Sequence, residues 1–261
     1  MRCLLLVTIL LCYSGHATSA LIGSALADGD DIGLVHYHNE LSTPFTSSQD
    51  AFQIIALDSA LIGPEQLWDR SAEAGKTDTL GLIDTSGAVR GRVFAVSDTV
   101  NSDTSSGALT ASWTFSVAGF RALELGLDIA AMGDFEHSDQ FTFRYAFDDE
   151  DMRPLWQSSV DVSSMQEYEL ASGVRINLDD PLMMANERVS NEFRHFSHNF
   201  TDLGSELTIA LTAKTDGGSE VFAFNNLKIQ GERTVAAPVP EPNGLLTLVI
   251  AIGLCSMRCR V

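Results

Sequence analysis

Two short acidic segments hold the residues that are best suited to bind a metal ion. Asp134, Glu136 and Asp139 lie in the segment GDFEHSD, and Asp148 and Asp149 open the run DDED. Calcium prefers about six to eight oxygen ligands, so a loop with several carboxylates could supply part of such a shell. The DDED run lacks alternating ligand positions and a sharp-turn glycine, and it also fits a solvated hairpin tip. The spacing in GDFEHSD, beside an expected strand, makes it the more suggestive calcium candidate.

Four histidines form two closely spaced pairs. His36 and His38 would share one face of a strand, and His195 and His198 form the second pair. Imidazole is a ligand for zinc and copper, and cupins are metal-binding jelly rolls with an HxH motif. That motif has a glutamate three or four residues after its second histidine, whereas Glu40 follows His38 by two. We therefore expect surface histidines rather than a metal site.

No catalytic motif is visible in the sequence. It lacks the GxSxG nucleophile elbow, a phosphate-binding loop and a dinucleotide fingerprint. Its four cysteines all lie near the ends, so the body has neither a cysteine nucleophile nor a thiolate zinc site. A carboxylate pair for glycoside hydrolysis is set by distance in space, which keeps a secreted hydrolase as an alternative. We expect a protein that is not an enzyme.

Tryptophans bear on a second alternative, a carbohydrate-binding module. An exposed tryptophan could stack on a sugar ring. Trp113 lies on an alternating apolar face and is expected in the core, whereas Trp68 and Trp156 lie in loop-like segments. We expect partly buried packing residues at both of these positions, with sugar stacking as the competing role.

The composition excludes two classes of protein. The chain has 35 Asp plus Glu against 16 Lys plus Arg, for a net charge of −19. Such a surface repels a polyanion, so no nucleic acid partner is expected. A hydrophobic fraction of 45% is too high for a disordered chain.

The body of the chain shows the two-residue apolar alternation of β-strands. The alternation is strongest over 109–117, 123–129, 141–147 and 207–211, and strands are also expected over 52–57, 89–96 and 221–229. Short helices are expected near 64–70 and 181–188, and a hairpin loop at Asp216-Gly217-Gly218. Many short strands at this spacing predict an all-β protein, an antiparallel β-sandwich of jelly-roll type.

The second half of the body, residues 109–230, resembles a domain found in bacterial extracellular proteins. The segments AAMGDFEHSDQFTFRYAFDDE, NLDDPL and SELTIALTAKTDGGSEVFAFNNLKIQG carry the resemblance. It implies a jelly-roll module of the galactose-binding or carbohydrate-binding kind, often a non-catalytic companion of secreted enzymes. Relatives often have an aspartate where this chain has Asn225, which weighs against a calcium role there.

The N-terminus reads as a secretory signal peptide. Arg2 precedes an apolar run and small residues follow, which is the order that export requires. Cleavage is expected after Ala20 or after Ala27, and the sequence does not choose between them. We assign residues 1–27 to this signal and residues 28–231 to the β-sandwich domain.

The C-terminus has three parts in a fixed order. After a linker at 232–239 come Pro240, Glu241 and Pro242, an apolar segment at 244–257, and the basic residues Arg258 and Arg260. The apolar segment is expected to form a short transmembrane helix whose arginines stay on the cytoplasmic side. The order resembles the PEP-CTERM sorting signal, here residues 240–261. The resemblance implies recognition by an exosortase and removal of the tail.

Together these features predict an exported, non-enzymatic protein of the cell envelope or extracellular matrix. The precursor would be anchored in the inner membrane, with an exosortase and then an extracellular polysaccharide as partners. A strongly acidic domain also invites bridging by divalent cations. No cofactor is firmly indicated by the sequence, and calcium is the one candidate. A carbohydrate-binding module with a defined glycan site and a secreted hydrolase are the alternatives.

Overall fold

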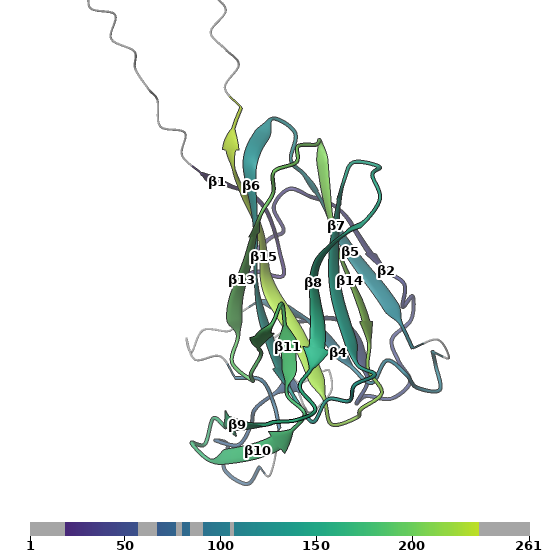
Figure 1. Ribbon diagram of the computed structural model, residues 1–261, viewed down its shortest axis with the longest axis vertical. Helices are drawn as coiled ribbons and strands as arrows, with labels where there is room; N and C mark the ends of the chain where they lie inside the picture. The colour runs from purple at the N-terminus through teal and green to yellow at the C-terminus, as the bar shows by residue number, and fades with distance from the viewer. Residues whose placement is uncertain (1–18, 57–66, 77–79, 84–90, 105–106, 235–261) are drawn as a thin grey trace, which may run out of the picture.

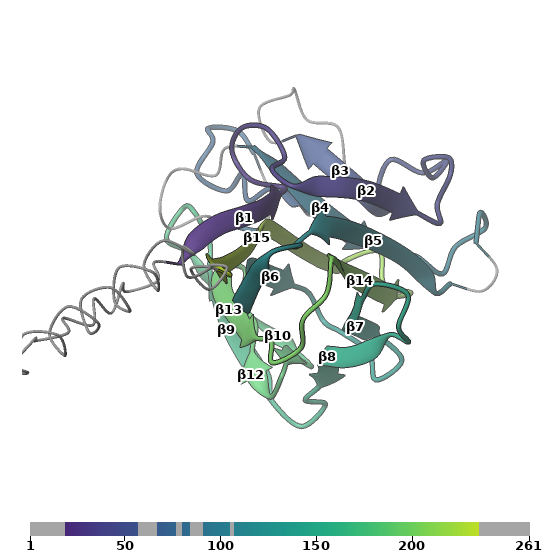
Figure 2. The ribbon, with the colours of Figure 1, turned by 90° about the horizontal axis from the view of Figure 1, so that it is seen from above.

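The protein folds into two antiparallel β-sheets that face each other (Figures 1 and 2). The computed structural model describes residues 19–56, 67–76, 80–83, 91–104 and 107–234, and these contain fifteen strands and no α-helix. Within these ranges no helix is long and apolar enough to span a membrane. The expected apolar helix at 244–257 and the sorting residues Pro240, Glu241, Pro242, Arg258 and Arg260 lie outside the described residues.

The first sheet has six strands, built around two long ones. Its order is β13 (Arg194–Asn199), β6 (Phe120–Met132), β15 (Val221–Arg233), β4 (Arg92–Ser97) and β3 (Ala51–Ala56), and β1 (Ala20–Ala25) also pairs with β15. β6 pairs with β15 along nearly its whole length, from Met132 opposite Val221 to Phe120 opposite Arg233. β4 and β1 pair with β15 at different points of its length.

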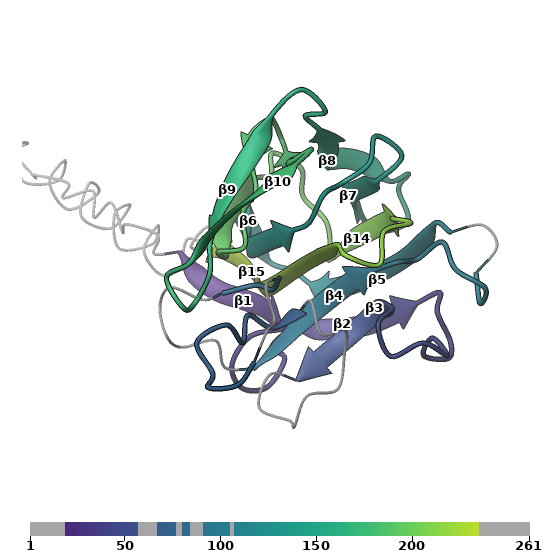
Figure 3. The same cartoon turned by 90° about the horizontal axis from the view of Figure 1, so that it is seen from below.

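The second sheet has seven strands. Its order is β12 (Glu187–Arg188), β11 (Leu182–Met184), β8 (Arg153–Val160), β7 (Gln140–Phe147), β14 (Glu206–Lys214), β5 (Leu109–Ser116) and β2 (Leu34–Asn39). β9 (Met165–Glu169) and β10 (Arg175–Asp179) form a separate hairpin at one end of the sandwich (Figure 3).

Eight of these strands are connected as a jelly roll. The orders β4-β15-β6-β13 and β5-β14-β7-β8 are those of two interlocked Greek keys, with the chain crossing repeatedly between sheets. The predicted antiparallel jelly-roll sandwich is therefore confirmed. β1, β2 and β3 precede this unit, and β2 and β3 add one outer strand to each sheet.

An aromatic core fills the space between the sheets. Trp113 of β5 is fully buried, and its ring packs edge-on against Phe94 and Phe224 of the opposite sheet, with ring centroids 5.1 and 5.3 Å apart. Leu109, Ala111 and Phe115 are buried beside it, as the alternation predicted. The period of two thus places every second residue of β5 in the core and the others on the outer face.

Two local predictions are wrong. Residues 181–188 form the β11–β12 hairpin and not a helix, because Ala185 and Asn186 take positive φ angles of 52° and 64° and reverse the chain. The Asp216-Gly217-Gly218 segment is not a hairpin loop either, because β14 and β15 belong to different sheets. Of the expected helix at 64–70, residues 64–66 lie outside the described part, and 67–70 form no α-helix.

The two expected signal-cleavage positions differ in what they would do to this fold. Cleavage after Ala27 would remove all of β1 and the residue after it, including the buried Ala25 and Leu26, which are 2% and 1% exposed. The Leu26 carbonyl also accepts a hydrogen bond from the Asn226 backbone N–H at 3.0 Å. Cleavage after Ala20 would leave this strand almost whole.

We predict that export yields a mature protein that begins at Leu21. Removal of β1 would uncover part of β15 and expose buried apolar side chains, each worth about 1.5–3 kcal/mol. N-terminal sequencing of the exported protein checks the position. Ala20→Asp should block processing, because cleavage needs a small residue there, whereas Ala27→Asp should leave it unchanged. A mature chain that begins at Asp28 would contradict the prediction.

Candidate functional site

Two acidic residues are held in the turn that connects β6 to β7, where the chain passes from one sheet to the other. The Glu136 N–H donates to Asp139 Oδ2 at 2.7 Å, and the Asp139 N–H donates to the Glu136 carbonyl at 2.9 Å. This reciprocal pair fixes the turn and holds the Asp139 side chain. Asp139 is 3% exposed, and its second oxygen, Oδ1, is buried with no hydrogen-bond partner among the described residues.

The third acidic residue, Glu220, comes from the connection between β14 and β15, which also crosses between the sheets. Thr215 Oγ1 donates to Glu220 Oε2 at 2.8 Å, and Ser97 Oγ donates to the Glu220 carbonyl at 2.8 Å. Two glycines leave room for this residue. A Cβ on Gly133 would lie 2.8 Å from the Glu220 Cα, and one on Gly217 would lie 2.2 Å from Glu220 Oε1.

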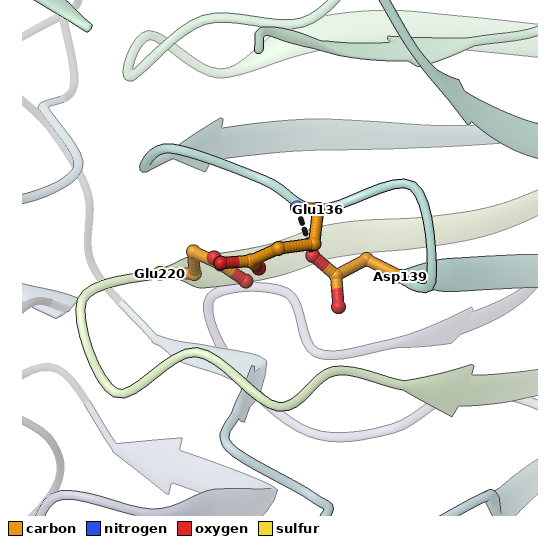
Figure 4. Close-up of side chains that lie close together, drawn as sticks. All are labelled: Glu136, Asp139 and Glu220. Carbon is orange, nitrogen blue, oxygen red and sulfur yellow. Dashed lines mark hydrogen bonds between the residues drawn. The ribbon is translucent and has the colours of Figure 1, made fainter. Parts of the chain in front are cut away.

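Glu136, Asp139 and Glu220 meet as a single group, named here the carboxylate cluster (Figure 4). One carboxylate oxygen from each lies within 4.8 Å of the others. Glu220 is 2% exposed, Asp139 is almost as buried, and Glu136 is exposed at the mouth of the group. All donors are oxygen atoms, the set that hard cations such as calcium and magnesium prefer.

Burial of these acids strongly changes their protonation. Desolvation raises the pKa of Glu220 to about 10, helped by the neighbouring Glu136 and Asp139. Desolvation also raises the pKa of Asp139 to about 6. Without a cation, Glu220 therefore holds a proton at neutral pH, whereas Asp139 releases its proton near pH 6.

The structure divides the sequence-predicted calcium candidates. Glu136 and Asp139 come together as expected, but Asp134 is exposed outside the cluster, and burial and the nearby Asp180 raise its pKa. Asp148 and Asp149 follow the far end of β7, whereas Asp139 precedes its start. The two acidic segments therefore do not form one site.

Asp148 has a structural role in its turn. Its Oδ1 accepts hydrogen bonds from the Ser205 and Glu206 backbone N–H groups, both at 2.9 Å. Asp148 itself has a φ of +49°, as expected in a tight turn after β7. Asp149 is exposed. The interpretation as a solvated hairpin tip fits this geometry.

The two histidine pairs lie in different sheets and do not form a common site. His36 and His38 lie on β2, with their rings stacked 6.4 Å apart. His195 and His198 lie on β13, where His195 Nδ1 is 2.8 Å from Asp128 Oδ1. Among the described residues, the carboxylate cluster is the one group of three or more acidic, histidine or cysteine side chains with metal-binding spacing.

A second feature is the outer face of the seven-stranded sheet. Six hydroxyl side chains on neighbouring strands form what we name the hydroxyl face: Thr110, Ser112, Thr114, Thr142, Thr208 and Thr212. Cross-strand contacts order it, with Oγ1 atoms 3.1 Å apart in Thr110–Thr212 and 2.9 Å apart in Thr114–Thr208. His36 and His38 pair with Thr114 and Ser112 at one side, and the exposed Arg144 lies on the other.

No tryptophan or tyrosine within the described residues is exposed. Trp113 is fully buried and Trp156 is 9% exposed. Trp68 is half-buried and packs against an apolar cluster that includes Val93 and Ala95 of β4. The expectation that these are packing residues is met for all three tryptophans. A sugar that reached the hydroxyl face would therefore meet polar groups rather than an aromatic platform.

Comparison with known proteins gives a likeness in fold only. No family model and no curated protein sequence matches the chain. Among solved structures, TmCBM61 in complex with beta-1,4-galactotriose has 6% identity and a TM-score of 0.31, over 56% of this chain and 76% of its own. The CBM22-1–GH10 modules of Clostridium thermocellum xylanase 10B, complexed with xylohexaose, have 12% identity and a TM-score of 0.26, over 58% and 24%. These values are too low to transfer a ligand to this chain.

Replacement of Gly133 by alanine should destabilise the fold through Glu220. Gly133 has a φ of +154°, and the new Cβ would lie 2.8 Å from the Glu220 Cα, so backbone must move. We expect a loss of about 2 kcal/mol in the free energy of unfolding, measured by urea denaturation. Gly218→Ala is the control, because no atom lies within 4 Å of its Cβ position. Equal losses in the two variants would contradict the prediction.

The metal-free protein should lose stability as the pH rises. The Asp139 pKa is raised from 3.8 to about 6 on folding, so the folded state binds more protons between these values. The unfolding free energy then falls across this window, and Glu220 continues the fall toward pH 10.

Thermal unfolding in chelator-containing buffer measures this dependence. Glu220→Gln removes one of the titrating groups. The midpoint temperature of the variant minus that of the wild type should therefore increase as the pH rises from 4 to 8. A constant difference between the two proteins over this range would contradict the raised pKa values.

Proposed function

We propose that the β-sandwich is a non-enzymatic module of an exported matrix protein and that it binds extracellular polysaccharide across the hydroxyl face. One observation carries the proposal: the strands that form this face hold almost no acidic residues in a strongly acidic chain. β2, β5, β7 and β8 contain no Asp or Glu, and β14 has only Glu206, at its first residue, although the chain has 35 acidic residues.

The chemistry of the face suits sugar hydroxyls. Each threonine or serine hydroxyl can donate one hydrogen bond and accept others, as a sugar hydroxyl does. Arg144 adds donors with a positive charge, and His36 and His38 add ring nitrogens. A polysaccharide with carboxylate groups would therefore not be repelled here. Without an aromatic platform, each contact is weak, and binding along a polymer would depend on many repeated contacts.

The geometry of the carboxylate cluster supports a function without hydrolysis. Glycosidases need two carboxyl groups about 5–9.5 Å apart that flank an accessible sugar bond. Here Asp139 and Glu220 are 3% and 2% exposed, so a sugar chain cannot lie between them. The cluster is thus better suited to a small ion than to a glycosidic bond.

Export and sorting complete the proposal. The signal peptide and the PEP-CTERM-like tail, residues 240–261, would carry the precursor to the inner membrane and present it to an exosortase. Processing would then place the acidic sandwich among the polysaccharides of the envelope or the extracellular matrix. In that setting the hydroxyl face would provide adhesion rather than turnover.

Negative charge placed on the hydroxyl face should weaken binding. The purified protein is screened on an array of neutral and uronate-containing polysaccharides, and the best-bound polymer is then titrated against the double variant Thr208→Glu/Arg144→Glu. We expect about tenfold weaker binding, because the variant adds two carboxylates and loses one guanidinium.

Ser197→Glu is the matched control, because Ser197 is an exposed residue on β13 of the other sheet. Its binding should stay at the wild-type level. The proposal fails if the wild type binds no polysaccharide on the array, or if the control loses as much binding as the double variant.

A further inference from the structure

We propose that Glu136, Asp139 and Glu220 bind one calcium ion and that this ion joins two of the crossover connections of the jelly roll. The inference is independent of the polysaccharide proposal. It rests on the geometry of the carboxylate cluster and on the place of that cluster in the fold (Figure 4).

The first argument is that the cluster contains a buried carboxylate oxygen without a hydrogen-bond partner. Asp139 is only 3% exposed, and its Oδ1 atom has no hydrogen-bond partner among the described residues. An unpaired buried carboxylate oxygen is costly, since it has lost its water without replacement. Asp139 belongs to the group in which one carboxylate oxygen of each residue lies within 4.8 Å of the others, the spacing that a single ion can bridge.

The second argument is the local charge. Three carboxylates converge, and the structure gives none of them an ion pair with Lys, Arg or His among the described residues. Three further acids lie at this end of the sandwich. Asp98 follows β4, Asp134 follows β6, and the Asp180 carbonyl accepts a hydrogen bond from the Phe135 N–H in the β6–β7 connection. This end therefore has an excess of negative charge that a divalent cation would reduce.

The donor set selects the ion. Carboxylate oxygen without histidine or cysteine favours calcium or magnesium over zinc or copper. Magnesium demands a near-ideal octahedron, whereas calcium accepts irregular shells and bidentate carboxylates. The ligands here come from two separate connections, and only Glu136 is exposed to complete the shell with water. Such an irregular, half-buried set fits calcium better.

The position of the cluster explains what the ion would do. Glu136 and Asp139 lie in the β6–β7 connection and Glu220 in the β14–β15 connection, and each connection passes from one sheet to the other. One ion bound to both would tie the two sheets together at this end. Calcium would then act as a structural clamp rather than as a catalyst.

Thermal unfolding with and without calcium tests the site. The purified full chain is treated with a chelator, dialysed, and heated with calcium chloride, with magnesium chloride, or with neither. We expect calcium to raise the midpoint temperature by about 5 °C, as for an extracellular site with millimolar calcium in excess of its dissociation constant. Isothermal titration should give one calcium ion per chain.

Three variants locate the effect. Glu220→Gln and the exposed Glu136→Gln should each abolish the calcium shift, and the second keeps the test valid if the first fails to fold. Asp149→Asn, in the other acidic segment, should leave the shift unchanged. The site is overturned if calcium has no effect on the wild type, if the shift persists in Glu136→Gln, or if magnesium stabilises equally. Loss of polysaccharide binding alone would leave it standing.

Discussion

The antiparallel pairing of β6 with β15 is the constraint on which the other features depend. Both strands have 13 residues and are paired from Met132 opposite Val221 to Phe120 opposite Arg233. Because the end of β6 lies beside the start of β15, the connections that leave them toward the other sheet must meet. The carboxylate cluster forms at that meeting point, and Trp113 of the opposite sheet packs against Phe224 of β15.

The two outer faces of the sandwich have opposite character, although both are made by alternate residues of strands. On the six-stranded sheet, the outward residues form a second apolar cluster with Leu67, Tyr168 and Leu170, so part of the face is covered by the β9–β10 hairpin. On the seven-stranded sheet, the outward residues of β5 and β14 are threonine, serine and alanine, with Glu206 and Lys214 at the two ends of β14. One outer face is therefore apolar and partly covered by other elements, whereas the other is polar.

The positions of the strands could be predicted from the sequence, but the sheet to which each strand belongs could not. Alternation at 109–117, 141–147 and 207–211 follows directly from a buried inner face, and the described strands β5, β7 and β14 occupy these ranges. Alternation says nothing about which sheet receives the next strand. The Asp216-Gly217-Gly218 segment has hairpin composition, yet it crosses between sheets because β14 and β15 have their partners in different ones.

The same limit explains why the candidate site was predicted only in part. Glu136 and Asp139 are three residues apart, so one loop brings them together, and local spacing could identify them. Glu220 joins them from more than 80 residues away, through the strand order alone. Its one local signal is the pair of glycines, Gly217 and Gly218, which precede an acidic residue at the start of an apolar strand.

The acidic composition acquires a physical meaning when it is divided among these surfaces. A net charge of −19 disfavours compaction through self-repulsion, and burial of Asp139 and Glu220 adds to that cost. A fold that was selected only for stability would place neutral residues at these two positions, since an apolar pair avoids the desolvation penalty. Asp139 and Glu220 lie at the junction of two crossover connections, where the proposed calcium ion would offset this penalty. The hydroxyl face is the complementary case. Among the strands that form it, only β14 has an acidic residue, Glu206 at its start, so most of the acid lies elsewhere and this surface stays open to a neutral or anionic polymer.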